Sequence, residues 1–236
     1  MKAIELSPRL RSVAELVTAG GRFVDVGTDH AYLPVWLLQR GVISHAVATD
    51  LRRGPLERAM HTAEKYGLSD KMDFRLCDGL EGVRPEEADA IAIAGMGGET
   101  AAAILAAAPW TREQNCRLLL QPMSAQPFLR RWLQEHGYAI RREVISREGD
   151  TLYITLLAEA GSMEPLTPAE AWAGRQSRGE DAPLRAEHLN RLLCRAERAA
   201  AGLRRAAAQD APRLEELEQV CQGLRSMKEE WLSWQL

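Results

Sequence analysis

Hydrophobic and polar positions follow two alternating patterns up to about residue 160 of the chain. Short, nearly continuous apolar runs are typical of strands covered on both faces, and apolar residues three or four positions apart are typical of amphipathic helices. The predicted strands cover residues 23–28, 45–50, 72–77, 88–94, 117–121, 139–147 and 151–158. The predicted helices begin with one that starts at Pro8 and continue with residues 33–40, 55–66, 99–107 and 125–135.

Strands and helices alternate before the last two strands, which predicts a parallel sheet with right-handed crossovers. Glu148-Gly149-Asp150 joins the last two strands, and such a short glycine-containing link is typical of an antiparallel hairpin. A parallel sheet with a terminal hairpin resembles the seven-stranded sheet of class I methyltransferases more than the six-stranded dinucleotide-binding sheet. The predicted fold class is therefore α/β, with a class I (Rossmann-like) sheet.

Beyond Pro165 the strand-like runs disappear and two long helical patterns remain. Their apolar stripes are Leu189, Leu192, Leu193, Ala196, Ala199, Ala200, Leu203 and Ala207, and then Leu214, Leu217, Cys221, Leu224, Met227 and Trp231. Asp210 is placed to cap the second helix and Pro212 lies in its first turn. We expect an antiparallel helical hairpin with coiled-coil-like spacing, and two domains at residues 1–163 and 164–236.

Composition narrows the class of protein. Hydrophobic residues make up 46% and charged residues 27% of the chain, as in ordinary globular proteins, and the net charge of −3 excludes a strongly basic nucleic-acid binder. No apolar run approaches the roughly 20 residues of a membrane span, and charges at the start argue against a signal peptide. The four cysteines form no CxxC pair, so we expect a reduced, cytoplasmic protein without a metal site or a disulfide framework.

Carboxylates and glycines follow the predicted strands at their carboxyl ends, where open α/β sheets bind ligands. The set comprises Asp25, Gly27, Thr28, Asp29 and His30 after the first strand, Asp50 and Leu51 after the second, Asp78 and Gly79 after the third, and Gly95, Met96, Gly97 and Gly98 after the fourth. The first turn holds no Lys or Arg, and neither a complete GxGxxG pattern nor a P-loop is present, which disfavours a phosphate chain. Ribose hydroxyls, an ammonium and a sulfonium suit such carboxylates better, which indicates S-adenosylmethionine.

Roles within this set follow from position along the sheet edge. Asp50 lies 23 residues after Gly27, near the spacing of the acid that accepts ribose hydroxyls, and Gly27 lets the methionine part approach the backbone. Asp25 or Asp29 can accept the ammonium. The adenine amino group is assigned to Asp78. Each aspartate alone could be a helix cap or a loop acid, but their recurrence at three successive strand ends favours a binding site.

Four strings in order along the chain resemble the bacterial TrmK family: DVGTDHAYLP at residues 25–34, CDGL at 77–80, AGMGG at 94–98 and LQP at 120–122. The resemblance runs from Leu6 to about Ala158, and the helical hairpin fits the family's C-terminal coiled-coil domain. It implies an S-adenosylmethionine-dependent enzyme that methylates N1 of adenosine 22 in tRNA. The chain departs from the family at Met123, where an Asn is usual, and at Asp50, where the acid is often Glu.

The reaction implied by the resemblance is an in-line methyl transfer, in which alignment of the reacting atoms supplies much of the acceleration. Neutral adenine N1 has an in-plane lone pair and needs no strong base, whereas the methylated base is cationic and is stabilised by a nearby carboxylate. Asp29 is the candidate for that carboxylate, with His30 and Tyr32 orienting the base. This role competes with ammonium binding by Asp29, and the sequence leaves both open.

N1 lies on the Watson–Crick edge, so the enzyme must expose the base while phosphate contacts hold the rest of the tRNA. The candidate phosphate contacts are Arg9, Arg11, Arg52, Arg53, Arg191, Arg195 and Arg198. Arg185, Arg204 and Arg205 add to the basic character of the first C-terminal helix. The alternative explanation for these basic residues is that they pair with the acidic second helix.

We expect a monomer. The alternative functions are a class I methyltransferase acting on another RNA, a protein or a small molecule, a non-catalytic RNA-binding module, and a nicotinamide dehydrogenase.

Overall fold

The computed structural model describes residues 3–205 and 210–235. The chain divides into two compact units. The first comprises Met1–Ala125 and Trp132–Met163, and the second comprises Gln126–Arg131 and Glu164–Leu236. The short segment of residues 126–131 that belongs to the second unit is not marked by any change in the sequence pattern.

A seven-stranded sheet forms the centre of the first unit. Its strands are β1 (Arg22–Val26), β2 (His45–Asp50), β3 (Met72–Leu76), β4 (Ala90–Gly97), β5 (Arg117–Ser124), β6 (Tyr138–Glu148) and β7 (Thr151–Ala160). Their order is β3-β2-β1-β4-β5-β7-β6, with β7 antiparallel to β5 and β6 and the other pairs parallel. The predicted α/β class with a terminal hairpin is confirmed.

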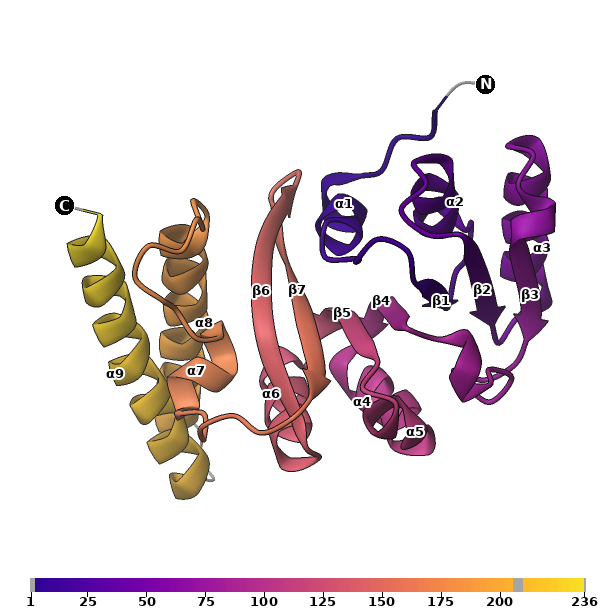
Figure 1. The fold of residues 1–236 in the computed structure, drawn as a ribbon. Helices are drawn as coiled ribbons and strands as arrows, with labels where there is room; N and C mark the ends of the chain where they lie inside the picture. The colour runs from indigo at the N-terminus through magenta and orange to yellow at the C-terminus, as the bar shows by residue number, and fades with distance from the viewer. Residues whose placement is uncertain (1–2, 206–209, 236) are drawn as a thin grey trace. The chain divides into compact units, whose positions relative to one another are not determined.

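Helices cover both faces of this sheet. They are α1 (Pro8–Ala14), α2 (Tyr32–Gln39), α3 (Arg53–Lys65), α4 (Gly98–Ala107), α5 (Trp110–Glu113) and α6 (Gln126–Glu135), with 3₁₀ turns η1 (Ser69–Lys71) and η2 (Pro85–Glu87). Figure 1 shows α1 and α2 on one face and α4 and α5 on the other. Burial on both sides explains why Leu118, Leu119 and Leu120 of β5 are fully enclosed and why its sequence is continuously apolar.

The ends of β4 and β5 extend further than the apolar pattern predicts. Gly97 pairs with Ser124 after a register shift at Met96, so β4 continues through part of the glycine-rich run that we placed after the predicted strand 88–94. The next residue, Gly98, begins α4 against the backbone of Ala125, where an added Cβ would lie 2.6 Å from the Ala125 carbonyl oxygen. Glycine is required there because two segments of backbone meet.

Besides the first part of α6, the described residues of the second unit form helices α7 (Pro168–Ala173), α8 (Arg185–Arg205) and α9 (Ala211–Trp234). Ion pairs between Arg204 and Glu218 and between Arg225 and Glu197 show that α8 and α9 run antiparallel, side by side (Figure 1). The sequence did not predict α7, because its capping box opens only six helical residues. It packs on α9 at Gly223, where an added Cβ would lie 2.5 Å from that of Ala169. Ala207 of the predicted stripe lies outside the described residues, and coiled-coil packing stays a prediction.

Two buried arginines cap the carbonyl end of α7. Arg130 donates to the carbonyls of Ala171 and Trp172 at 3.0 Å each, and this contact explains why residues 126–131 belong to the second unit. Arg185 donates to the next two carbonyls, at residues 173 and 174, at 2.7 Å each. Counting Arg185 among the surface arginines was therefore wrong. Burial, together with neighbouring arginines, lowers the pKa of His188 to about 3, so this histidine is neutral at physiological pH.

Candidate functional site

A pocket of about 600 Å³ opens at the carboxyl ends of β1, β2 and β4. It lies where the parallel strands of such a sheet bind ligands. The structure brings twelve residues of the predicted catalytic and cofactor-binding set together in its lining: Asp25, Gly27, Thr28, Asp29, His30, Tyr32, Asp50, Leu51, Asp78, Gly79, Gly95 and Met96. Gly97 of the predicted set is not in the lining; it pairs with Ser124 of β5.

The turn between β1 and α2 has an unusual backbone conformation. Gly27 has φ +69°, and the non-glycine residues Asp29 and Ala31 have φ +50° and +54°. Left-handed conformations at non-glycine residues cost on the order of 1 kcal/mol each. The amides of Gly27 and Thr28 donate to the carbonyl of Thr49 at 2.8 and 3.1 Å, which ties the turn to β2. The strain concentrates at the part of the pocket that holds His30.

Asp25 is the buried carboxylate of the pocket. Its side chain accepts a hydrogen bond from the Thr28 hydroxyl at 2.6 Å, and the residue is 6% exposed. Burial raises the pKa of Asp25 to about 6. The hydrogen bond from Thr28 opposes this rise, and the nearby negative charge of Asp50 adds to it. A cation bound beside Asp25 would relieve the cost of this buried charge.

The ends of β2 and β3 supply the other acidic wall. Asp50 is buried, and its Oδ1 accepts the backbone amide of Arg52 at 2.9 Å. The Thr49 hydroxyl donates to the carbonyl of Gly79 at 2.9 Å and joins the two strand ends. Gly79 has φ +52° and lies so close to Ile104 that an added Cβ would be 3.0 Å from two of its atoms. Asp78 is thereby held on the same rim as Asp50.

Asp29, in the lining of the pocket, contacts two charged or titratable side chains. It forms an ion pair with Arg58 of α3, and its Oδ2 lies 3.7 Å from Nε2 of His30. The His30 ring stacks on Tyr32, with ring centroids 5.1 Å apart and an interplanar angle of 11°. Tyr32 is 43% exposed, so this stacked pair presents a flat aromatic surface at the rim. No sequence pattern singles out Arg58, because its partner lies 29 residues away along the chain.

The rim is less acidic than the sequence indicated, since Arg9 and Arg52 both line the pocket. Arg9 donates to Oε1 of Gln121 at 2.7 Å, and the amide of Gly95 donates to the same oxygen at 3.2 Å. The Arg9 guanidinium also lies 5.8 Å from the ring centroid of Tyr153. Arg9, expected on the outer surface of α1 as a phosphate contact, is instead part of the pocket wall.

The other arginines predicted to contact RNA are not among the residues that line the pocket. In the first unit, Arg11 and Arg53 are exposed. On α8, Arg191 pairs with Glu187 at 2.7 Å, Arg195 lies 5.8 Å from the Trp172 ring centroid, and Arg198 donates to the Cys194 carbonyl at 3.1 Å. Arg191, Arg195 and Arg198 are exposed despite these local partners, so a phosphate can reach them from solvent.

Two further features concern the described residues as a whole. In residues 3–205 and 210–235, no cluster of three or more His, Cys, Asp or Glu side chains could hold a metal ion. Over the same ranges, no helix is long and apolar enough to cross a membrane. The chemistry of the pocket is that of carboxylates, hydroxyls, glycine backbone and two guanidiniums, which suits a cationic ligand with hydroxyl donors better than a phosphate chain.

Comparison with known proteins gives a consistent result. Residues 6–156 match a family model described as a methyltransferase domain. The tRNA (adenine(22)-N(1))-methyltransferase of Bacillus subtilis (strain 168) is 41% identical over 164 residues, which cover 70% of this chain and 69% of that protein. The crystal structure of the B. subtilis m1A22 tRNA methyltransferase TrmK superposes with a TM-score of 0.84 at 33% identity, covering 95% of this chain and 99% of that one. A Streptococcus pneumoniae protein in complex with S-adenosyl-L-methionine gives a TM-score of 0.81 at 32% identity, covering 95% and 100%.

Proposed function

We propose, since this chain belongs to the TrmK family of tRNA (adenine(22)-N(1))-methyltransferases, that it transfers a methyl group from S-adenosylmethionine to N1 of adenosine 22 in tRNA. The family resemblance predicted from the sequence is confirmed, as is the cofactor. The observation that carries the proposal is the pocket at the ends of β1, β2 and β4, whose carboxylates suit a cationic nucleoside without phosphates.

The residues of the pocket fit the cofactor by their chemistry. When bound, S-adenosylmethionine supplies an electrophilic methyl group on a positively charged sulfur. We assign the ammonium to Asp25, because a buried carboxylate with a raised pKa gains most from a cation. Asp50 accepts the ribose hydroxyls and Asp78 the adenine amino group. Gly27, with its positive φ, brings bare backbone to the methionine part.

We assign Asp29, His30 and Tyr32 to binding of the adenine base of the substrate. The stacked rings of His30 and Tyr32 offer the kind of flat surface on which proteins hold unstacked bases. Asp29 lies beside them and carries the negative charge that stabilises the cationic product base. Because we assign the ammonium to Asp25, we assign Asp29 to the substrate base and not to the cofactor. Arg58 then holds the Asp29 carboxylate in place until the base arrives.

Exposed arginines supply the contacts to the tRNA backbone in this proposal. Arg11, Arg52 and Arg53 belong to the first unit, and Arg191, Arg195 and Arg198 to α8. Phosphate contacts of this kind position an RNA without reading its sequence. We also propose that the enzyme acts as a monomer in the cytoplasm, where its tRNA substrate is available. Light scattering of the purified full chain tests the oligomeric state.

The decisive experiment is nucleoside mass spectrometry after incubation of the full chain with S-adenosylmethionine and tRNA transcripts. Two transcripts should be compared, one with adenosine 22 and one with guanosine 22. We expect 1-methyladenosine in the first and none above background in the second. Methylation that is equal in both transcripts would mean that the target lies elsewhere in tRNA. Methylation of neither transcript, with cofactor binding intact in calorimetry, would indicate another acceptor.

A further inference from the structure

A second hollow adjoins the pocket described above, on the side of β3 and α4. It has a volume of about 410 Å³ and lies between the loop of residues 78–81 and one face of α4. Four residues line both hollows: Asp78 and Gly79 from the loop, and Thr100 and Ile104 from α4. The two hollows therefore meet at these residues, and a ligand held in the first can extend into the second.

Small residues keep the second hollow open. Ala103 and Ala107 lie one turn apart on α4, and both are exposed in its lining, so a larger side chain at either position would fill the space. On the loop side, an added Cβ at Gly79 would lie 3.0 Å from two carbon atoms of Ile104. A side chain at residue 79 would press on Ile104, so the glycine keeps the junction between the two hollows from closing.

The lining of the second hollow combines apolar and acidic groups. Leu80 and Ala108 are buried apolar residues, whereas Asp78, Glu81 and Glu99 are exposed carboxylates. Among the described residues that form this lining there is no Lys, Arg or His to offset the negative charge. The apolar part favours a short alkyl chain, and the carboxylates attract a cation and repel an anion.

The position proposed for the cofactor's adenine shows what can enter this hollow. Asp78 accepts the exocyclic amino group in the proposed function, and Asp78 belongs to both linings. The amino group has two N–H bonds, and its hydrogen bond to Asp78 uses one of them. The other can be replaced by an alkyl chain without loss of that hydrogen bond. A chain attached there begins at the junction between the two hollows.

We propose that the second hollow is a binding subsite for a short alkylammonium chain attached to the exocyclic nitrogen of adenine. The inference rests on the proposed function, from which it takes the position of the adenine. The natural cofactor has an unsubstituted amino group and does not reach this subsite. Adenosyl compounds that carry such a chain are therefore a class of ligand that competes with S-adenosylmethionine and gains affinity from contacts that the cofactor itself does not make.

The test is isothermal titration calorimetry with the purified full chain and four ligands. The first is S-adenosylhomocysteine. The other three are its derivatives with a 4-aminobutyl, a pentyl or a 4-carboxybutyl group on the exocyclic nitrogen of adenine. These three chains are similar in length and end in a cation, a methyl group and an anion, so they separate the effect of filling the hollow from the effect of charge.

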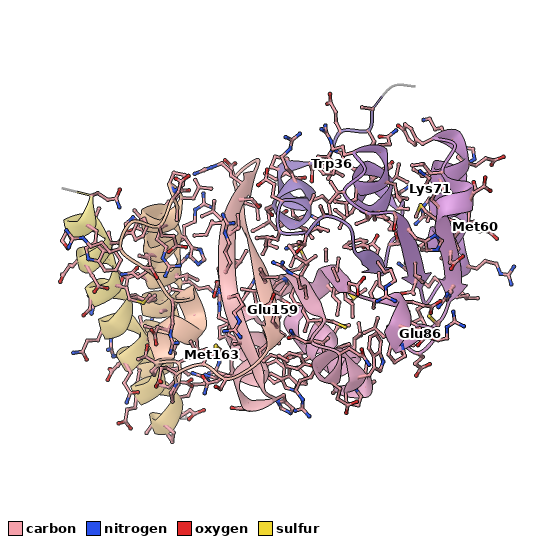
Figure 2. The ribbon with its side chains drawn as sticks, in the orientation of Figure 1. Trp36, Met60, Lys71, Glu86, Glu159 and Met163 are labelled. Atoms are coloured by element: carbon pink, nitrogen blue, oxygen red, sulfur yellow. The ribbon has the colours of Figure 1, made fainter. Side chains whose placement is uncertain are left out.

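Two variants fill the hollow, and one changes its charge. The filling variants are Ala103→Leu and Ala107→Leu, and their control is Ala106→Leu, because Ala106 is exposed on α4 outside the lining. The charge variant replaces both Glu81 and Glu99 by Gln. Its control is Glu86→Gln, because Glu86, labelled in Figure 2, is exposed in η2 and does not line the hollow.

We expect the aminobutyl derivative to bind the wild type about 10-fold more tightly than S-adenosylhomocysteine, because the chain buries methylene groups and its ammonium meets carboxylates. The pentyl derivative should bind with intermediate affinity, and the carboxybutyl derivative should bind most weakly of the three. Each filling variant should remove the gain of the aminobutyl derivative and leave S-adenosylhomocysteine unchanged. The charge variant should bring the aminobutyl derivative to the affinity of the pentyl derivative, and both controls should bind like the wild type.

Three results would overturn the proposal. Weaker binding of all three derivatives than of S-adenosylhomocysteine would mean that a substituent does not pass the junction. A gain in affinity that neither filling variant reduces would place the chain outside the hollow. Equal gains for the three chains would reject a preference for a cation. Circular dichroism of each variant checks the fold, and leucine is a good helix former at the exposed positions that are changed.

Binding of S-adenosylhomocysteine to the wild type separates the subsite from the proposed function. If S-adenosylhomocysteine binds and the derivatives give one of these three results, only the subsite is rejected. If S-adenosylhomocysteine itself does not bind, the cofactor assignment fails and the subsite fails with it.

Discussion

Asp25→Asn is predicted to increase the stability of the ligand-free protein at neutral and alkaline pH while impairing cofactor binding. The folded-state pKa of Asp25, about 6, lies above its ordinary value of 3.8, because the ionised form is buried. The folded state therefore binds the proton more tightly than the unfolded state. The stability contributed by this group is fully present below pH 4, is lost as the pH rises from about 4 to about 6, and stays lost above that.

The magnitude follows from the two pKa values. The folded-state pKa and the ordinary pKa differ by about 2, and each tenfold step in proton affinity corresponds to about 1.36 kcal/mol. The ligand-free wild type therefore loses about 3 kcal/mol of stability between pH 4 and pH 7. Asparagine keeps an oxygen for the Thr28 hydroxyl and carries no charge, so the loss should disappear in the variant. Other carboxylates titrate in the same range, but they are common to both proteins and cancel in the difference.

The assay is urea unfolding of ligand-free wild type and Asp25→Asn at several values between pH 4 and pH 8, followed by circular dichroism. Asp70→Asn is the control, because Asp70 is exposed in η1 and outside the pocket. The free energy of unfolding of Asp25→Asn relative to wild type should increase with pH and level off above pH 6. A relative free energy that stays flat with pH would refute the buried-charge reasoning.

Three further changes test other features of the structure. Gly98→Ala should destabilise the fold by about 1–3 kcal/mol in urea unfolding, because the added Cβ would meet backbone oxygens. Gly202→Ala in α8 is the control and should be neutral or stabilising, because the space around Gly202 is open. Equal effects of the two substitutions would contradict the packing argument. Arg58→Gln should lower kcat for tRNA methylation without changing affinity for S-adenosylhomocysteine, and Arg58→Lys should restore much of it; a loss of ligand affinity would instead assign Asp29 to the cofactor site. Replacing Arg195 and Arg198 together by Gln should weaken tRNA binding. The slope of log affinity against log salt concentration should fall in magnitude by roughly 0.7–0.9 for each phosphate that these arginines neutralise. An unchanged slope would mean that this part of α8 does not contact the RNA.

The sheet and most of its ligand-binding edge could be predicted from the sequence because both are encoded locally. Apolar runs mark buried strands, and an aspartate at or just after the end of a strand must lie at the carboxyl edge of a parallel sheet. Asp25, Asp50 and Asp78 therefore line one pocket as expected. The predicted strand ended at residue 94 because glycine carries no apolar pattern, although β4 continues through Gly97.

Contacts between distant elements were beyond the reach of sequence patterns. Arg9 and Arg58 look like ordinary surface arginines in their helices, and only the packing of α1 and α3 on the sheet brings them to the pocket. The same holds in the second unit, where Arg185 is one residue of a basic helix by its sequence and a buried cap in the structure. A charged residue can be assigned to solvent or to a partner only when the partner's position in space is known.

The hydrogen bond between Arg9 and Gln121 joins residues 112 positions apart. Closing so long a loop has a large entropic cost, so this contact can form only when the sheet between them has assembled. A chain emerging from the ribosome cannot complete the wall of its pocket until β5 has left the exit tunnel. Capture of the cofactor would therefore report assembly of the sheet as far as β5, and a chain truncated before β5 would lack this part of the pocket wall.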